Sequence, residues 1–457
     1  MPATAEPSSS RRHRRPRRGS RRPARVLLDT EAVIGIHSST TTAAEDRTRN
    51  EMPIRVSFLL RRPPHPSTLF VHSSDLNPSV APDILCSADD LLLLGVNMVR
   101  SPLPPCGKDY DFFFYRADPS RPSLHLLRRP HPHLSCYGGV GLHPRPGGNY
   151  TVAALNFTGW ISRTLSVEAP QEDFPVRIPR NCGRIFHHRT TAAVTIGGEG
   201  GTMGWADLWR GVLLCDVLDP KPSLRGVPLP LPLVEMGYNN VWGMELGNPA
   251  QRRGIAFVRD KGCLKFVHLE ITEKYVQEID EVTGLTSVRV DDWALTTWSN
   301  TKMSSSMEDW HKESVVRASG IAIDPAVSRV LEDTGLLLRG RRPDDEERRD
   351  LQNLSMYQPS PCISVVYLVA REKFSHPRAW VLAVDMKNGG RLQSAAYFGI
   401  RRYHGVDVIY CPSRISKYMN PAKYEKPATT PLGQDAEESN EDGEVELIKI
   451  PDRGGLY

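Results

Sequence analysis

Short apolar runs alternate with clusters of turn-forming residues along most of this chain of 457 residues. In the clearest cases an apolar run leads into an acidic or turn-forming cluster, which leads into a second apolar run. This pattern is typical of a β-hairpin, in which two short strands flank a tight connection. It occurs at residues 112–130, 165–180, 212–230, 276–290 and 381–398.

The spacing of these hairpins favours an all-β fold built from repeats. Successive hairpins start about 50 to 60 residues apart, and the last gap is about twice as long. Residues 321–332 are the candidate for the missing unit, and an earlier unit spans residues 54–72. A period near 50 residues with two visible strands per unit fits a four-stranded propeller blade. We therefore expect a β-propeller-like stack of hairpin-based blades, with a pair of β-sandwiches as the alternative because the spacing is irregular.

Prolines occupy every second position at the end of the central hairpin, in the stretch "GVPLPLPL". Alternate residues of an extended strand direct their N–H groups to the same edge, so Pro228, Pro230 and Pro232 remove donors from one edge only. The aliphatic residues between them keep their donors on the other edge and share one face. Residues 227–232 are therefore predicted to form an edge strand that pairs on one side and resists aggregation on the other.

Charge is unevenly distributed, although the formal net charge is only +5. Most of the excess lies in residues 11–25, "RRHRRPRRGSRRPAR", whereas the C-terminal segment is acidic. These segments have little to bury, so we predict disorder for residues 1–24 and 421–457, around one large β domain at residues 25–420. The folded body shows no basic face, so any nucleic-acid partner would bind only through residues 11–25 of the Arg-rich leader. The leader is alternatively a solvated extension, a nuclear-import signal or an organelle transit peptide.

The chain has no run of about twenty apolar residues and no signal-peptide core, so we expect no membrane contact and an intracellular location. Nucleus and cytoplasm are both compatible with the leader. The eight cysteines form no C-x-x-C pair, and several, such as Cys215, sit inside strand-like runs. They are interpreted as buried, reduced thiols.

Two segments resemble ligand sites, but each lacks a part that the chemistry requires. The glycine-rich segment 195–205 lacks the Lys-Ser/Thr ending of a phosphate-binding loop, and no helix pattern follows it. Zinc needs four converging ligands, and one cluster of His and Cys residues has no second pair at a matching spacing. That cluster consists of His125, His131, His133 and Cys136. We therefore expect no cofactor and no metal, and no catalytic motif such as G-x-S-x-G or H-E-x-x-H is present.

The stretch "GWADLWRGVLLCDVLD…LRGVPLPLP" resembles the central signature of a plant family expanded in grasses, domain of unknown function 1618 (DUF1618). The segments "RVLLDTEAVIG", "DDLLLLGV" and "AWVLAVDM" resemble the family's flanking regions, so the resemblance covers roughly residues 25–420. It implies no activity. The residues that carry the motif are Trp205, Asp207, Trp209, Arg210, Gly211, Cys215, Asp216, Pro228, Leu229 and Pro230.

Within this motif, Trp205 and Trp209 bracket Asp207 and could form a ligand cage. The alternative is that the indoles fill the space between sheets while Asp207 and Arg210 bond to turn amides or to each other.

A large β body without a catalytic motif favours a non-catalytic protein-interaction scaffold. Tyr238 and Trp242 are candidate partner contacts, because aromatic side chains bury a large area at little entropic cost. The alternative for Trp242 is packing under the next blade. Two other functions stay open: an enzyme whose residues converge only in three dimensions, and a nucleic-acid-associated protein that acts through its leader.

Overall fold

The computed structural model describes a chain built almost wholly of β-strands. The described residues are 25–420 without the segments 39–40, 99–109, 128–138, 158–162, 168–171, 177–187, 232–247, 280, 283, 285, 339–348, 375 and 401–409. Within them the one α-helix is α1 (Pro325–Asp333). The short 3-10 turns are η2 (Pro146–Gly148), η6 (Pro249–Gln251), η7 (Arg259–Lys261), η8 (Met307–Asp309), η9 (Ala318–Gly320), η10 (Leu351–Asn353) and η11 (Ile415–Tyr418). No helix of this part of the chain is long and apolar enough to cross a membrane.

The described strands form six sheets, and most strands pair with the strands that precede and follow them in the chain. The first sheet has the strand order β27 (Tyr410–Ser413), β1 (Val26–Asp29), β5 (Pro66–His72), β4 (Pro53–Leu59) and β3 (Ala44–Arg47), with β2 (Val33–Ile34) beside β5. The second has the order β6 (Asp83–Ala88), β7 (Leu91–Asn97), β8 (Tyr110–Arg116) and β9 (Ser123–Leu126). The third has the order β10 (Val140–Pro144), β11 (Tyr150–Phe157), β12 (Arg163–Val167) and β13 (Glu172–Val176).

The remaining three sheets are also built mainly from consecutive strands. The fourth has the order β14 (Ala192–Gly197), β15 (Thr202–Asp207), β16 (Gly211–Asp216) and β17 (Arg225–Pro228). The fifth has the order β18 (Arg253–Val258), β19 (Cys263–Ile279), β20 (Thr286–Asn300) and β21 (His311–Arg317). The sixth has the order β22 (Ala322–Ile323), β26 (Arg391–Ile400), β25 (Arg378–Asp385), β24 (Val365–Arg371) and β23 (Ser355–Pro361).

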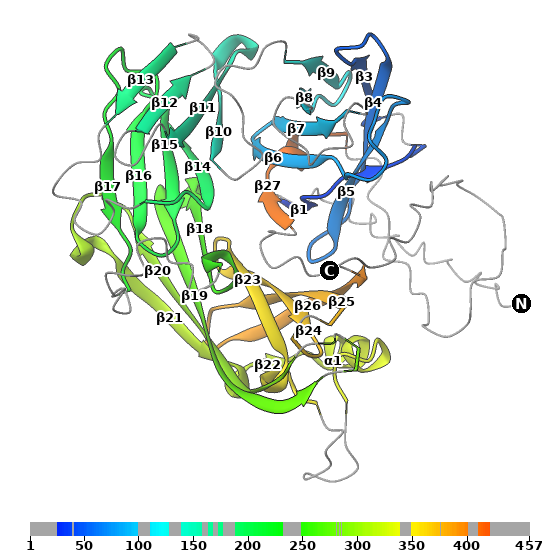
Figure 1. The fold of residues 1–457 in the computed structure, drawn as a ribbon. Coiled ribbons are helices and arrows are strands. Elements are labelled where there is room, and N and C mark those ends of the chain that lie inside the picture. The colour runs from blue at the N-terminus through cyan, green and yellow to red at the C-terminus, as the bar shows by residue number, and fades with distance from the viewer. Residues whose placement is uncertain are drawn as a thin grey trace, which may run out of the picture.

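The sheets follow one another around a common centre, and each packs face to face against the next (Figure 1). Clusters of buried apolar side chains fill the space between each pair of neighbouring sheets. A further cluster joins the sixth sheet back to the first through Tyr357, Leu27 and Tyr410. The fold is therefore an all-β propeller, as the hairpin spacing predicted, and not a pair of sandwiches.

Inner strands such as β7 and β16 are apolar on both faces because a neighbouring sheet covers each side. On β16, Leu213 and Cys215 face the third sheet, whereas Val212 and Leu214 face the fifth. A strand in this position has no solvent face, so its sequence is a continuous apolar run and not an alternation.

The first and last described strands close the ring. β27 pairs with β1 in antiparallel register, from Val26 opposite Ser413 to Asp29 opposite Tyr410. The Tyr410 hydroxyl donates to the Gln358 carbonyl on β23 at 3.0 Å, so β27 also contacts the sixth sheet. The strand β27 thus links the first sheet to the sixth.

The predicted hairpins are confirmed, but one of them occupies a different place in its sheet. The segments at 112–130, 165–180 and 212–230 contain the third and fourth strands of their sheets, and the segment at 381–398 contains the paired strands β25 and β26 of the sixth sheet. The segment at 276–290 instead joins β19 to β20, the second and third strands of the fifth sheet. This difference explains part of the irregular spacing.

The expectation for residues 321–332 is wrong, because most of this segment is the helix α1. The Asp324 side chain accepts from the backbone N–H of Ala326 at 3.0 Å and caps the helix, and Pro325 occupies its first turn. Leu331 is fully buried, and Val327 packs against the same core cluster. The capped amphipathic turn resembles an apolar strand pair in sequence, because both place apolar residues close to turn-forming ones.

The proline-rich segment forms an edge strand, as predicted, although the regular strand is shorter. β17 pairs with β16 alone, and it ends at Pro228 and not at residue 232. The Leu229 N–H still donates to the Arg210 carbonyl at 3.5 Å, and Val227 and Leu229 are both buried. On the open edge, the Trp310 indole donates to the Pro228 carbonyl at 2.6 Å.

Candidate functional site

The family motif lies on the fourth sheet and in the turn between β15 and β16. Trp205 is fully buried on β15, and its indole Nε1 donates to the Gly139 carbonyl at 2.8 Å. Gly211 begins β16, which ends at Asp216, and the Asp216 carboxylate accepts from the Thr202 hydroxyl at 2.5 Å. Pro230 follows the end of β17. The motif therefore brings together residues that build one sheet.

Asp207 organises the turn that follows β15. Its carboxylate accepts from the backbone N–H of Trp209 at 2.9 Å and of Arg189 at 2.8 Å. The Arg210 guanidinium donates to the same carboxylate at 2.9 Å, and both side chains are almost completely buried. With its oxygens occupied in this way, the carboxylate stabilises the turn and is poorly placed to act as a base.

A second buried arginine covers the turn from the fifth sheet. The Arg253 guanidinium stacks on the Trp209 ring, with 4.4 Å from Cζ to the ring centroid, and donates to the Leu208 carbonyl at 3.1 Å. Burial lowers the pKa of Arg253 to about 10, so the group stays charged near neutral pH. The two indoles thus pack within and between sheets, and we see a packing role and not a ligand cage.

The motif cysteine is a packing residue. Cys215 is fully buried in the core between the third and fourth sheets. Burial, together with the nearby Asp216 carboxylate, raises the pKa of its thiol to about 12. A thiol that stays protonated near neutral pH is a poor nucleophile and a poor metal ligand. The five cysteines in the described residues are free: Cys86, Cys215, Cys263, Cys362 and Cys411. Cys215 and Cys263 are buried, as expected, whereas the other three are only partly buried.

The remaining sequence candidates give no site in the described part of the chain. The glycine-rich segment is the turn between β14 and β15, inside one sheet, and a strand and not a helix follows it. His125 is exposed on β9, and the other members of its cluster lie outside the described residues. No group of three His, Cys, Asp or Glu side chains among the described residues could hold a metal. Tyr238 and Trp242 also lie outside the described residues.

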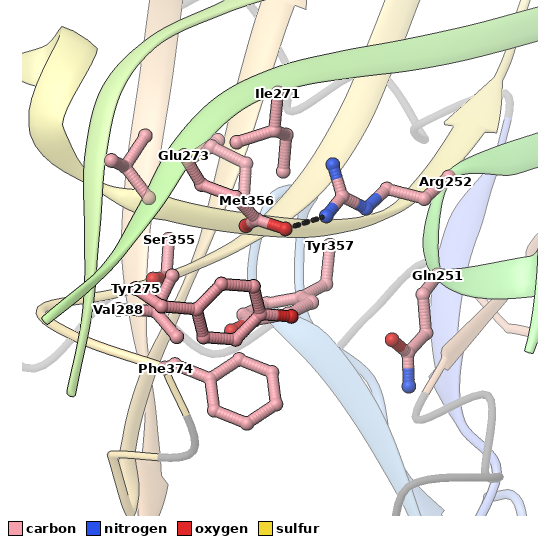
Figure 2. A pocket seen from close by; sticks show the side chains of 11 residues that line it. Gln251, Arg252, Ile271, Glu273, Tyr275, Val288, Ser355, Met356, Tyr357 and Phe374 are labelled. Carbon is pink, nitrogen blue, oxygen red and sulfur yellow. Dashed lines mark hydrogen bonds and ion pairs between the residues drawn. The ribbon is translucent and has the colours of Figure 1, made fainter. Parts of the chain in front are cut away.

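A pocket that the sequence did not indicate lies between the fifth and sixth sheets. It has a volume of about 270 Å³ and opens between β19 and β23 (Figure 2). Its lining residues are Gln251, Arg252, Ile271, Glu273, Tyr275, Val288, Val290, Ser355, Met356, Tyr357 and Phe374.

The pocket combines an aromatic end with one ion pair. Arg252 donates to the Glu273 carboxylate at 2.9 Å, and their side chains are 30% and 29% exposed. The rings of Tyr275, Tyr357 and Phe374 lie together at the other end (Figure 2), with 6.3 Å between the centroids of the last two. Apolar walls with few polar groups are typical of a binding pocket. The lining offers no nucleophile paired with a base, so the arrangement supports binding more than chemistry.

One wall of the pocket belongs to a ribbon that extends beyond its sheet. β18 pairs with β19 only as far as His268, and β21 pairs with β20 only from Ala294 onwards. The part of the β19–β20 hairpin between these points, residues 269–293, forms this ribbon. Its outer half exposes three large apolar side chains, Tyr275, Ile279 and Val282, by 79%, 73% and 62%.

The sequence contains a signal for the ribbon in addition to the hairpin pattern. Residues 276–290 interrupt apolar positions with acidic ones, which is unlike the continuous apolar runs of the covered strands. A hairpin with this pattern has a solvent-facing side.

Comparison with known proteins finds a family of unknown function that matches the central part of the chain. Residues 205–344 match a family described as "Protein of unknown function (DUF1618)", which confirms the resemblance of the central signature. No curated protein matches the sequence significantly. A solved structure of α-L-arabinanase from Penicillium chrysogenum, complexed with arabinobiose, is similar over 83% of this chain and 99% of that one, at 9% identity and a TM-score of 0.26. So low a score carries no argument about fold or function.

Proposed function

We propose that this chain, with its DUF1618 region, is a non-catalytic scaffold that binds another protein through the ribbon and the adjoining pocket. The observation that carries the proposal is the exposure of Tyr275, Ile279 and Val282. These are the three most exposed large apolar side chains of the described residues, and all three lie on one ribbon. Grouped apolar side chains on a protein surface mark interaction sites, whereas single ones need no explanation.

The polar groups near the family motif support the same function. The Asp207 carboxylate is occupied by turn amides and Arg210, and the Cys215 thiol is buried and protonated. An enzyme would need at least one such group poised toward a cavity. In the described residues the pocket has aromatic walls and a paired Arg252–Glu273 instead, which suits the docking of a side chain.

The test is binding to a purified partner. Candidate partners are captured with the intact chain from an extract of its source organism and then purified for calorimetry. The double variant Tyr275→Ser and Ile279→Ser is expected to weaken binding about ten-fold or more, because a few anchor residues contribute most of the binding energy. The matched control is Val315→Ser with Val330→Ser, which removes apolar groups that are 47% and 44% exposed on β21 and α1.

Two results would contradict the proposal. One is equal loss of affinity in the ribbon variant and the control. The other is absence of any partner together with turnover of a small molecule by the pure protein, which would favour an enzyme. The separate prediction for Tyr238 and Trp242 is tested in the same assay with both residues changed to Ala. A nucleic-acid role of residues 11–25 would appear as binding that weakens steeply with added salt.

A further inference from the structure

The edge of the ribbon next to the pocket has backbone groups that pair with no other strand of the described residues. The Leu269 N–H donates to the Arg252 carbonyl at 2.7 Å, and this bond is the last between β18 and β19. Alternate residues of a strand direct their N–H groups to the same edge, so those of Ile271, Glu273 and Tyr275 point away from β20. No other described strand pairs with this edge. Such an edge is a template for an added strand.

The two faces of the ribbon differ in chemistry. Ile271, Glu273 and Tyr275 line the pocket together with Val288 and Val290 across the ribbon. The opposite face carries the exposed side chains of Glu270, Thr272 and Lys274. A strand added to this edge would alternate in the same way, with every second side chain over the apolar pocket and the others in solvent.

Charge indicates which polar residues an added strand would carry. Residues 269–293 contain seven acidic and two basic residues, in a chain whose formal net charge is +5. On the solvent face the exposed Glu270 lies nearest to the sheet. A basic partner strand would be attracted to the ribbon, and a strand with acidic residues would be repelled.

We infer that the partner contributes an extended segment that pairs with the free edge of β19 and alternates apolar residues with Lys or Arg. This inference rests on the proposed function and specifies the partner's chemistry at that site. One apolar side chain, of a size up to an aromatic ring, enters the pocket beside Tyr357 and Phe374. Main-chain hydrogen bonds then supply affinity, and the alternation supplies specificity.

The test uses a panel of eight-residue peptides that alternate Lys or Arg with Ile, Leu, Phe or Trp, and measures fluorescence anisotropy with the full chain. The best binder is then synthesised in two N-methylated forms. One form blocks alternate N–H groups along one edge of the peptide, and the other form blocks those along the opposite edge. Because only one edge can face β19, one form is expected to lose at least ten-fold in affinity while the other keeps it. Loss in both forms or in neither overturns strand addition.

Two charge variants test the electrostatic part. Glu270→Lys is expected to lower the affinity for the basic peptide several-fold at low salt. The difference in affinity between the variant and the wild type should shrink as salt is added. Glu308→Lys makes the same change of charge at an exposed position of η8, away from the ribbon, and is expected to leave the affinity unchanged. Equal effects of both variants would overturn the assignment of the basic strand to the ribbon.

The outcomes separate this inference from the proposed function. If a protein partner binds the ribbon but the N-methylated forms behave alike, the scaffold stands and strand addition is wrong. The Arg-rich leader of this same chain is a competing occupant. A peptide of residues 11–25 could displace the best-binding peptide, and deletion of the leader could raise the affinity for that peptide. Both results together would mean that the leader of the same chain covers the edge, and the inference of a basic strand from another protein would be overturned.

Discussion

Two side chains beside the Asp207 turn, Arg253 and His268, have lowered pKa values because both are largely buried. His268 on β19 lies opposite Arg253 on β18. Burial, and then the charges of Arg253 and Arg252, lower the pKa of His268 to about 4. Its imidazole is therefore neutral in the folded protein at a pH where an unfolded chain would already bind a proton.

This difference predicts a loss of stability in mild acid. Because the folded pKa lies below the unfolded value, the stabilisation is full above about pH 6.5 and is lost progressively as pH falls toward 4. Between pH 7 and pH 5, the wild-type chain should lose on the order of 2 kcal/mol more unfolding free energy than His268→Gln. Urea unfolding at both pH values measures this difference. His125 is exposed on β9, so His125→Gln is the control. If both variants change the pH dependence of the unfolding free energy equally, the assignment of the acid-induced loss to His268 is wrong.

The residues of the family motif show what a sequence can reveal at this level. The pairing of Asp207 with Arg210 and with turn amides follows from their spacing in a tight turn, and it was one of two interpretations available from the sequence. The stacking of Arg253 on Trp209 joins residues of different sheets, and no local pattern indicates it. The pocket escaped prediction for the same reason, because its walls come from strands far apart in the chain.

Strand patterns were more informative than single residues. The alternating prolines predicted the edge position of β17, because a missing N–H has a direct geometric consequence. They did not predict where the strand ends, since that depends on how far β16 continues to pair with it. The helix α1 was missed because its capping residues, Asp324 and Pro325, are also common in turns.

One contact between strands leaves no room for a side chain. Gly254 on β18 faces β23 near Pro359, where the register of β23 shifts between Tyr357 and Ser360. A Cβ atom at Gly254 would lie 1.8 Å from the Pro359 carbonyl oxygen. The fifth and sixth sheets therefore approach each other more closely here than any other residue type would permit.

Gly254→Ala is consequently expected to destabilise the protein by about 2 to 4 kcal/mol, because a backbone carbonyl must move to make room. Gly320→Ala is the matched control, since no atom lies within 4 Å of its added Cβ. The control is expected to change stability by less than about 0.5 kcal/mol. Chemical denaturation of both variants measures the difference, and equal effects would show that the close approach relaxes easily.

The molecule as a whole depends on the pairing of β27 with β1. β27 touches both neighbouring sheets: the Ser413 and Ser87 hydroxyls are 2.7 Å apart, and Tyr410 bonds to β23. The apolar cluster between the sixth and first sheets includes Leu27 and Tyr410. Loss of β27 would uncover this cluster and leave β1 with one strand neighbour fewer.

A chain that ends after residue 409 should therefore unfold at a temperature roughly 10 °C lower or more, because several buried contacts are removed together. A chain that ends after residue 420 keeps β27 and is expected to unfold at the wild-type temperature. Differential scanning calorimetry of both truncations provides the comparison. Equal unfolding temperatures would mean that the ring holds together without its closing strand.

The same closure sets an order on folding during synthesis. The middle sheets are built from neighbouring strands, so each can form soon after its own residues leave the ribosome. The first sheet cannot be completed until residues 410–413 of β27 have been made. Throughout that interval Leu27 lacks part of its cover, and the free edge of β1 can pair with other chains. The interval grows with every pause of the ribosome before residue 410, so the speed of translation governs how long the nascent chain is open to aggregation.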